Sequence, residues 1–536
     1  MQCYYIKKMV DKKWIVLGDR SGQVLLTSKS TSNNGILPRG SFLTILDGEE
    51  KNPLFIIRVE ESEQIDLYNP SPLLVDMGYE VQQADRDSKN NIKAYRIYDF
   101  SKREDGLIDF IKPLSIARLS TQEEIEIALE SKINFGPSVF PSTIYGTRCQ
   151  KLIDTNGQLI KIKIPQDFYW HQIQISGKTG SGKTVATKYL AQNFIENPIN
   201  INSVQKYGCV LAINVKDTDF LKMDQESNTI SQEVLNEWNN LNMVPHGVNN
   251  YEIIYSSHKN KEDYLNNGVT GEFLKAVTLK AKKIKPDSLL GIIENLTELA
   301  SQVLPDIFRY WQDNSRPTET FQDFLTSYED GIARNNTFNL KDLNGIETQT
   351  NLNPNTAAAI FRRLKDANKY FDSTTNNVQE IDAENILEDG KLTVIDVAED
   401  LSFGSIILRY LLSDIMSKKR NNRDLPPILI IIDEVHQFYN SNASKSALGD
   451  LDTICRVGRS LNIGVIFSSQ NINDVPSGLS SVVNSKFIFK TDEISKKTFG
   501  INSEEIASMK QGFCICNIHG LPNIKSIKFP LSAAGV

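Results

Sequence analysis

The sequence is poor in the residues that build disulfide frameworks and metal sites. It has six cysteines and five histidines among 536 residues. No C-x-x-C pair occurs and the histidines are scattered, so zinc-type spacing is absent. Cys514 and Cys516 are two residues apart, which places both on one face of a strand. We therefore expect reduced, buried thiols and no structural metal.

Long apolar runs are also missing. The longest strictly apolar runs, such as Ile428 to Ile432, have five residues, whereas a membrane-spanning helix needs roughly 20. The N-terminal residues MQCYYIKKMVDKKW contain no apolar core of the kind that a secretory signal carries. We expect a soluble protein of the cytoplasm, not tied to a membrane.

An excess of basic residues is the third absence. The chain has 59 lysines and arginines against 66 acidic residues, a net charge of −7 and a pI near 5.5. Any nucleic-acid surface must therefore be local. Two basic clusters occur, and we interpret both as solvated surface: Lys280, Lys282, Lys283 and Lys285, and Lys418, Lys419, Arg420 and Arg423.

What remains is ordinary globular composition, 40% hydrophobic and 23% charged, and a length that suggests about three or four domains.

The N-terminal region alternates short strands with turns, which is typical of a small barrel or sandwich. Thr121 and Glu124 form a capping-box pattern that predicts a helix over 120–132. The strands expected there are Trp14–Leu17, Gln23–Thr27, Phe42–Leu46, Leu54–Glu60 and Ile92–Phe100.

From about residue 165, strand candidates alternate with helices, which favours a mainly parallel sheet covered on both faces. Residues 222–385 interrupt it: a helical period over 289–303 and a helix over 355–371 predict a mostly helical insert, with 335–353 as loop. The expected sheet strands are Gln172–Ser176, Cys209–Val215, Leu392–Val397, Ile428–Ile432, Gly464–Ser468 and Phe487–Phe489.

A phosphate-binding motif follows the first of these strands. Residues 177–184 read GKTGSGKT, a full match to G-x-x-x-x-G-K-[ST]. Such a loop turns backbone N–H groups inward and opens a helix, so both favour an anion. Lys183 is expected to reach the β- and γ-phosphates, and Thr184 to bind Mg²⁺. The expected nucleotide-binding residues are Gly177, Thr179, Gly180, Ser181, Gly182, Lys183, Thr184 and Val185.

An acidic pair, Asp433 and Glu434, ends the strand at Ile428–Ile432. Asp433 is expected to hold Mg²⁺, directly or through water, and Glu434 to polarise the attacking water. The pair therefore favours hydrolysis over binding alone. Lys183 and Asp433 are 250 residues apart, which disfavours an ordinary AAA+ or GTPase domain. No guanine-type N-K-x-D follows, so ATP is the expected nucleotide.

Two further elements complete the predicted site. Gln470 follows the strand Gly464–Ser468, where a polar side chain can contact the γ-phosphate. Arg456 and Arg459 precede that strand, and an arginine supplied to a neighbouring subunit makes hydrolysis depend on assembly. Lys183, Glu434, Gln470, Arg456 and Arg459 are the predicted catalytic residues.

Together these elements predict an α/β protein with a RecA-like P-loop ATPase core, a mainly parallel sheet, an N-terminal small β-barrel and a helical insert. The expected domains are the barrel at 1–150, the first part of the core at 151–221, the insert at 222–385, and the second part of the core with C-terminal strands at 386–536.

The motif set resembles the HerA group of the HerA/FtsK superfamily. The segments that carry the resemblance are GKTGSGKT, NVKDTDFL at 214–221, IIIDEVHQF at 430–438 and RVGRSLNIGVIFSSQ at 456–470. The acidic turn that the family carries after its second strand falls here on Asp217 and Asp219, and departs from the family's pattern.

The resemblance implies a ring, six-membered in the family, that moves double-stranded DNA at the expense of ATP and Mg²⁺. It also implies a partner, either a NurA-type nuclease or a nuclease-like or NAD-consuming effector of antiviral defence. The alternative is an ATP-switched oligomeric scaffold that activates a partner enzyme with little motor activity. A membrane-tied coupling or secretion ATPase shares these motifs, but the missing apolar segment counts against it.

Overall fold

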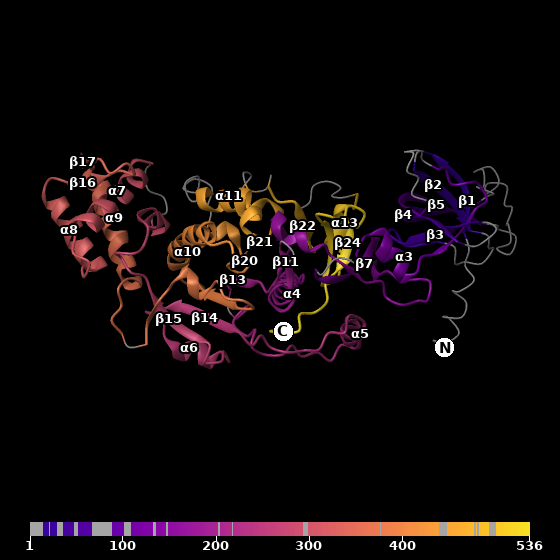
Figure 1. The fold of residues 1–536 in the computed structure, drawn as a ribbon, viewed down its shortest axis with the longest axis horizontal. Helices are drawn as coiled ribbons and strands as arrows, with labels where there is room; N and C mark the ends of the chain where they lie inside the picture. The colour runs from indigo at the N-terminus through magenta and orange to yellow at the C-terminus, as the bar shows by residue number, and fades with distance from the viewer. Residues whose placement is uncertain are drawn as a thin grey trace, which may run out of the picture.

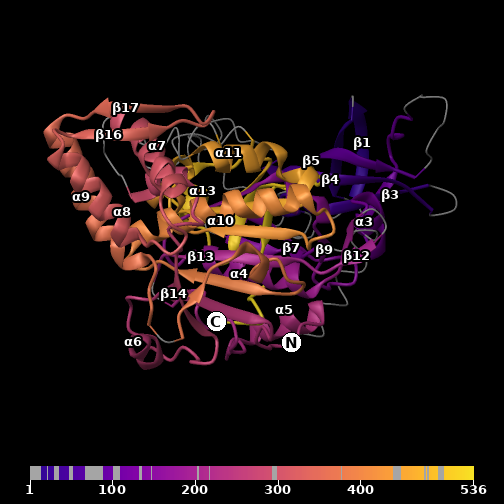
Figure 2. The same ribbon diagram turned by 60° about the vertical axis from the view of Figure 1, so that its left-hand side comes forward.

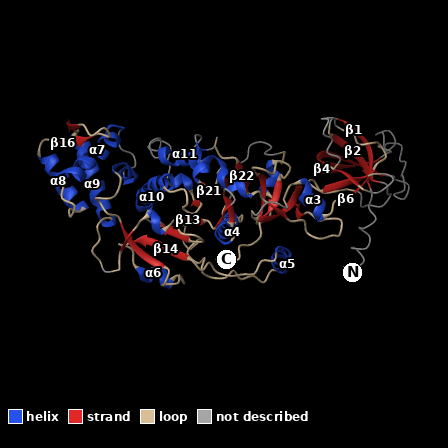
Figure 3. Ribbon diagram, in the orientation of Figure 1, coloured by secondary structure: helices blue, strands red, loops and turns tan. Residues whose placement is uncertain are grey.

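The molecule is elongated and has three parts in a row (Figure 1). A β-barrel lies at one end, a large sheet with its helices in the middle, and a helical bundle at the other end. Figure 3 shows the same division as a strand-rich end and a helix-rich end. The structure is a computed structural model. It describes residues 14–20, 22–28, 36–47, 52–66, 88–100, 109–131, 136–145, 148–201, 204–216, 218–292, 298–375, 377–438, 448–475, 479, 482–492 and 500–536.

The predicted N-terminal barrel is confirmed. Six strands close in the order β1-β2-β5-β4-β3-β6 around a core that includes Trp14, Val24 and Ile57. They are β1 (Trp14–Arg20), β2 (Gln23–Ser28), β3 (Phe42–Leu46), β4 (Pro53–Asp66), β5 (Ser88–Asp99) and β6 (Ile116–Leu119). The predicted helix follows as α3 (Gln122–Ala128), and both bonds of the Thr121–Glu124 capping box are present.

Within the described part of the chain, the central sheet has 14 strands. It is parallel from β18 to β22 and antiparallel beyond, in the order β18-β15-β14-β19-β13-β20-β21-β10-β22-β23-β24-β7-β8, with β9 beside β7. The strands are β7 (Ser138–Tyr145), β8 (Arg148–Lys151), β9 (Ile162–Lys163), β10 (Ile173–Ser176), β13 (Cys209–Asn214), β14 (Tyr251–Ser256), β15 (Leu274–Thr278), β18 (Gln379–Glu380), β19 (Leu392–Asp396), β20 (Ile428–Ile432), β21 (Ile463–Ser469), β22 (Ser485–Ile488), β23 (Phe513–Asn517) and β24 (Ser526–Lys528).

Helices cover both faces of the parallel part, as predicted (Figure 2). The alternation of strand side chains explains the two layers. Leu211 belongs to the apolar cluster that contains α10 (Leu401–Asn421) and α11 (Leu448–Val457). Its neighbour Val210 belongs to the cluster that contains α4 (Lys183–Glu196). Every residue of β20 is buried, because both faces of this strand are covered.

The order β13-β20-β21-β10-β22 is that of a RecA-like core. One strand, β21, separates the strand that leads into the P-loop from the strand that leads into Asp433. The predicted fold class is thus confirmed. Cys514 and Cys516 are buried on β23, and burial raises the pKa of both thiols. Among the described residues, no helix combines the length and apolarity that a membrane crossing requires.

The region 222–385 is less helical than predicted. It supplies β14, β15 and β18 to the central sheet as well as α5 (Gln232–Leu241) and α6 (Lys261–Asn266). The terminal bundle consists of α7 (Glu298–Asn314), α8 (Phe321–Ala333) and α9 (Pro354–Ala367). The helical period predicted over 289–303 falls on a 3₁₀ turn, η3 (Pro286–Ile292), and on the start of α7; residues 293–297 lie outside the described residues.

The prediction of a loop over 335–353 is wrong. These residues form a hairpin of β16 (Thr337–Lys341) and β17 (Glu347–Asn351). Phe338 packs into the bundle core against Tyr328, while Asp342 accepts from the N–H groups of Asn344 and Ile346 and so fixes the turn. The buried Phe338, the partly buried Leu340 and one Asx turn stabilise strands whose other residues are polar, which is why the composition indicates loop.

Candidate nucleotide-hydrolysis site

The glycine-rich loop joins β10 to α4, in the strand–loop–helix setting that the motif requires. The N–H of Gly177 donates to Ser469 O at 3.3 Å and that of Lys178 to Lys490 O at 2.8 Å, so β21 and the end of β22 hold the loop. Gly182 has φ +106°, and a Cβ there would lie 2.8 Å from the backbone N of Gly512. Only glycine fits this position.

The inner side of the loop offers hydrogen-bond donors. Thr179 and Gly180 are exposed, whereas Ser181, Gly182 and Lys183 are buried. The Ser181 hydroxyl is buried without a partner among the described residues. Thr184 and Val185 are half-buried in the first turn of α4. Unpaired donors at a helix N-terminus fit a phosphate chain.

Lys183 points back along the loop. Its amine donates to Gly177 O at 2.5 Å and to Lys178 O at 3.2 Å. Burial lowers the pKa of Lys183, and the nearby carboxylate of Glu434 opposes that effect. The lysine therefore lies between the loop and the acidic pair, where a terminal phosphate would also be bound.

The acidic pair lies beside the loop because the strands are parallel neighbours. Ser176 is in register with Ser469, Phe467 with Ile432, and Ile432 with Ile213. The carboxyl ends of β10, β21, β20 and β13 thus meet at one edge of the sheet, the usual place for a ligand in parallel sheets.

Asp433, Thr184 and Asp219 bring three oxygen donors together. Thr184 Oγ1 donates to Asp219 Oδ2 at 3.4 Å. Burial raises the pKa of Asp433, and a hydrogen bond with Ser468 lowers it. The negative charges of Glu434 and Asp219 also raise it. A hydroxyl and two carboxylates are the ligand types that Mg²⁺ prefers, so the residues fit this ion. Asp217 lies outside the described residues.

Glu434 is fully buried and tightly surrounded. Its Oε1 accepts from Lys216 and, at 3.3 Å, from Gln470. Its Oε2 has no hydrogen-bond partner among the described residues and lies 3.5 Å from His436 Nδ1. Glu434 also has φ +46°, a left-handed conformation that costs a non-glycine residue about 1–2 kcal/mol. The carboxylate is held through Oε1, and Oε2 has no donor bound to it among the described residues, so its lone pairs can accept a proton.

Arg456 and Arg459 lie at the opposite edge of the sheet. Arg456 ends α11 and Arg459 lies in the following turn, η7 (Gly458–Leu461), before β21 begins; both are exposed. Arg459 acts on His171, which precedes β10 at this edge. Burial and the charges of His519 and Arg459 lower the pKa of His171 to about 4. The seven residues of β21 span about 20 Å. Neither arginine can reach the P-loop of its own chain.

The structure thus gathers Lys183, Thr184, Asp433, Glu434 and Gln470 and separates the two arginines from them. Sequence reasoning missed Lys216 and His436. Lys216 lies in the segment Asn214–Leu221 that carries part of the family resemblance, and the sequence pattern there indicates a role only for the acidic residues. A lysine after a strand is not distinctive, and its contact with Glu434 follows only from the pairing of β13 with β20.

No protein-family model and no curated protein matches the sequence. Among solved structures, the chain is similar to the bacterial conjugative coupling protein TrwB, with 12% identity over 70% of this chain and 87% of that one, at a TM-score of 0.43. VirB4 of Thermoanaerobacter pseudethanolicus gives 12% identity over 74% and 97%, at 0.42.

The genome packaging NTPase B204 from Sulfolobus turreted icosahedral virus 2, in complex with AMPPCP, gives 19% identity over 28% of this chain and 71% of that one, at 0.21. These are likenesses of backbone arrangement.

Proposed function

We propose that this chain hydrolyses ATP with Mg²⁺ and that a ring of its copies uses the energy to move along double-stranded DNA. The observation that carries the ATPase is the cluster at the sheet edge, where the phosphate loop, three oxygen donors and the buried Glu434 meet. A binding-only site has no need of a fully buried, strained carboxylate beside the phosphate loop.

The residues divide the work. The loop N–H groups, Ser181 and Lys183 bind the phosphates; Thr184 and Asp433 hold Mg²⁺, with Asp219 next to Thr184. The ion, when bound, neutralises charge that develops on the phosphate oxygens. Glu434 orients the attacking water and accepts its proton through Oε2, while Lys216 and Gln470 keep the carboxylate in place.

Ring assembly follows from the position of the arginines. An arginine that cannot reach its own site can complete that of the next copy, and such head-to-tail contacts close into rings. We assign this role to Arg459, with Arg456 as the alternative. The number of six subunits comes from the HerA resemblance.

The HerA resemblance is also the basis for proposing double-stranded DNA as the substrate and a nuclease or defence effector as the partner. Four lysines of the two basic clusters are paired within the chain, so we assign no DNA contact to either cluster. Lys282 donates to Gln312 O and Lys283 pairs with Glu380. Lys418 pairs with Asp382 and Glu384, and the amine of Lys419 donates to Leu425 O and Pro426 O.

The test is steady-state ATP hydrolysis by the wild-type protein, with and without linear duplex DNA, at low and moderate salt. We expect DNA to raise turnover and salt to reduce that stimulation, because phosphate contacts release counterions. A Glu434→Gln protein runs beside it. If this variant kept wild-type turnover, the assignment of the site would be wrong.

A second function is favoured by the net charge of −7 and by the internal pairing of Lys283 and Lys418 in the two basic clusters. In it, the oligomer is an ATP-switched scaffold that activates a partner enzyme. ATP turnover indifferent to DNA, together with partner capture that requires ATP, would select this function over the motor.

A further inference from the structure

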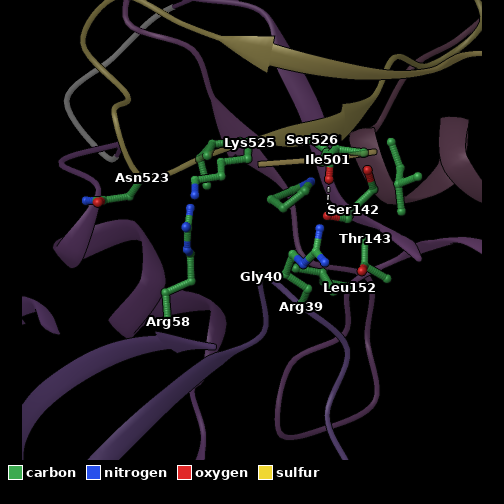
Figure 4. A pocket seen from close by; sticks show the side chains of 13 residues that line it. Arg39, Gly40, Arg58, Ser142, Thr143, Leu152, Ile501, Asn523, Lys525 and Ser526 are labelled. Atoms are coloured by element: carbon green, nitrogen blue, oxygen red, sulfur yellow. Dashed lines mark hydrogen bonds between the residues drawn. The ribbon is translucent and has the colours of Figure 1, made fainter. Parts of the chain in front are cut away.

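A small pocket lies at the seam between the barrel and the central sheet (Figure 4). Its volume is about 20 Å³, enough for one compact group and too small for a nucleotide base. We call it the seam pocket. Its polar lining consists mainly of Arg39, Arg58, Ser142, Thr143 and Lys525. Arg39 and Arg58 come from the barrel; Ser142 and Thr143 lie on β7 of the central sheet, and Lys525 directly precedes its neighbour β24.

Three cations converge on this space. Figure 4 shows Arg58 rising from the barrel and Lys525 descending from the opposite wall, so that their charged ends point toward one another. Glu60 lies between them, accepting from Arg58 at 2.9 Å and from Lys525 at 2.8 Å. Arg39 is 3.9 Å from Glu505 and donates to Gly500 O at 3.4 Å. Three cations thus face two carboxylates, which leaves positive charge in the pocket.

The pocket has more hydrogen-bond donors than acceptors. The side chain of Arg58 is 9% exposed, and of its five N–H donors only the one to Glu60 has a partner among the described residues. Ser142 and Thr143 are 3% and 5% exposed, and both hydroxyl oxygens are buried without a hydrogen-bond partner among the described residues. Because the two residues are consecutive on β7, their side chains point to opposite faces of the strand, and only one of the two hydroxyls counts as a donor to the pocket. Buried polar groups left unpaired are costly, so a ligand that accepts several hydrogen bonds would satisfy this pocket.

We propose that the seam pocket binds one phosphate group, which ties the barrel to the ATPase core. A tetrahedral oxyanion accepts from several directions at once, and the donors here come from opposite walls. Charge-assisted bonds from arginine to phosphate are among the strongest that side chains form. The phosphate is either inorganic phosphate or part of a nucleic-acid backbone. This inference does not depend on the proposed ATPase, because the pocket lies apart from the P-loop.

The experiment measures binding of radiolabelled inorganic phosphate to the full chain by equilibrium dialysis. All proteins carry Lys183→Ala, which weakens phosphate binding at the P-loop. We expect one phosphate per chain. Arg39→Met should weaken binding at least about tenfold, since it removes a charged hydrogen bond, and Arg148→Met, an exposed arginine on β8, should leave it unchanged.

Thr143→Val removes one unpaired hydroxyl with little change of shape and should also weaken binding. This variant keeps the test decisive if Arg39→Met fails to fold, which a denaturation curve detects. The proposal is overturned if the Lys183→Ala protein binds no phosphate up to about 10 mM, or if Arg39→Met and Thr143→Val bind as Arg148→Met does. Displacement of the label by duplex DNA identifies a backbone phosphate as the ligand; retention of the label identifies inorganic phosphate.

Discussion

Two glutamates in this molecule are fully buried and paired with lysine, yet their surroundings differ. Glu237 on α5 has both oxygens bound by Lys528, and Lys151 adds a further bond to Oε1. Glu434 at the sheet edge has one oxygen bound by Lys216 and the other without a hydrogen-bond partner among the described residues. Glu237 lies in a regular helix, whereas Glu434 has a left-handed backbone.

The difference separates a structural ion pair from a reactive one. A buried carboxylate that serves stability has its acceptors satisfied, because each unmet bond costs free energy. A carboxylate that must accept a proton keeps an oxygen available and tolerates strain to do so. Substitutions at the two glutamates, and at the residues that act with them, test whether they divide in this way.

The largest effect is expected at Glu434. Glu434→Gln keeps the shape and the bonds to Oε1 but removes the base, so ATP turnover should fall by up to about 10⁴-fold with little change in stability. Steady-state phosphate release and a urea titration measure the two quantities. If Glu434→Gln lost stability and kept its turnover, Glu434 would belong to a structural ion pair, as Glu237 does.

Arg459→Ala should reduce turnover by about 10³-fold if the arginine completes a neighbouring site. The decisive measurement mixes this variant with Glu434→Gln. Each protein is nearly inactive alone, but a mixed oligomer contains sites with an intact Glu434 and an intact Arg459 from the neighbour. Activity should therefore reappear on mixing, and its absence would contradict action between subunits.

Glu237→Gln should destabilise the protein by about 3–5 kcal/mol, because Lys528 is left buried without its counter-charge. Burial already lowers the pKa of Lys528, and Glu237 opposes that effect. Turnover per folded molecule should stay at the wild-type value. The double variant Glu237→Leu with Lys528→Met is the control, and it should recover most of the loss in a denaturant titration.

The smallest effect is expected at Lys216. Lys216→Met removes the cation that holds Glu434, so the carboxylate is less well positioned and turnover should fall roughly tenfold. Gln470 still donates to Oε1, which limits the loss. A pre-steady-state measurement of the hydrolysis step checks this. Unchanged turnover would mean that Lys216 only balances charge.

The sequence predicts those features that depend on local pattern. The barrel strands, the six sheet strands β10, β13, β19, β20, β21 and β22 and the capping box at Thr121 follow from alternation and spacing, whereas β14, β15 and β18 lie in a region predicted to be mostly helical. The geometry places the loop beside Asp433 and Glu434 as the motifs require. The hairpin at β16 and β17 depends on one aromatic, Phe338, reaching a distant core. Lys216 and the seam pocket depend on strand pairing and on contact between parts far apart in sequence, and no local pattern encodes either.

The position of Arg459 at the edge opposite its own P-loop determines how many nucleotide pockets an assembly can complete. If each chain carries a nucleotide pocket at one edge and the arginine that completes the next pocket at the other, an open row of copies always contains one pocket that no arginine reaches. Closing the row removes this deficit, so that completed pockets and chains become equal in number. Turnover per chain would then report whether the row has closed, independently of any measurement of size.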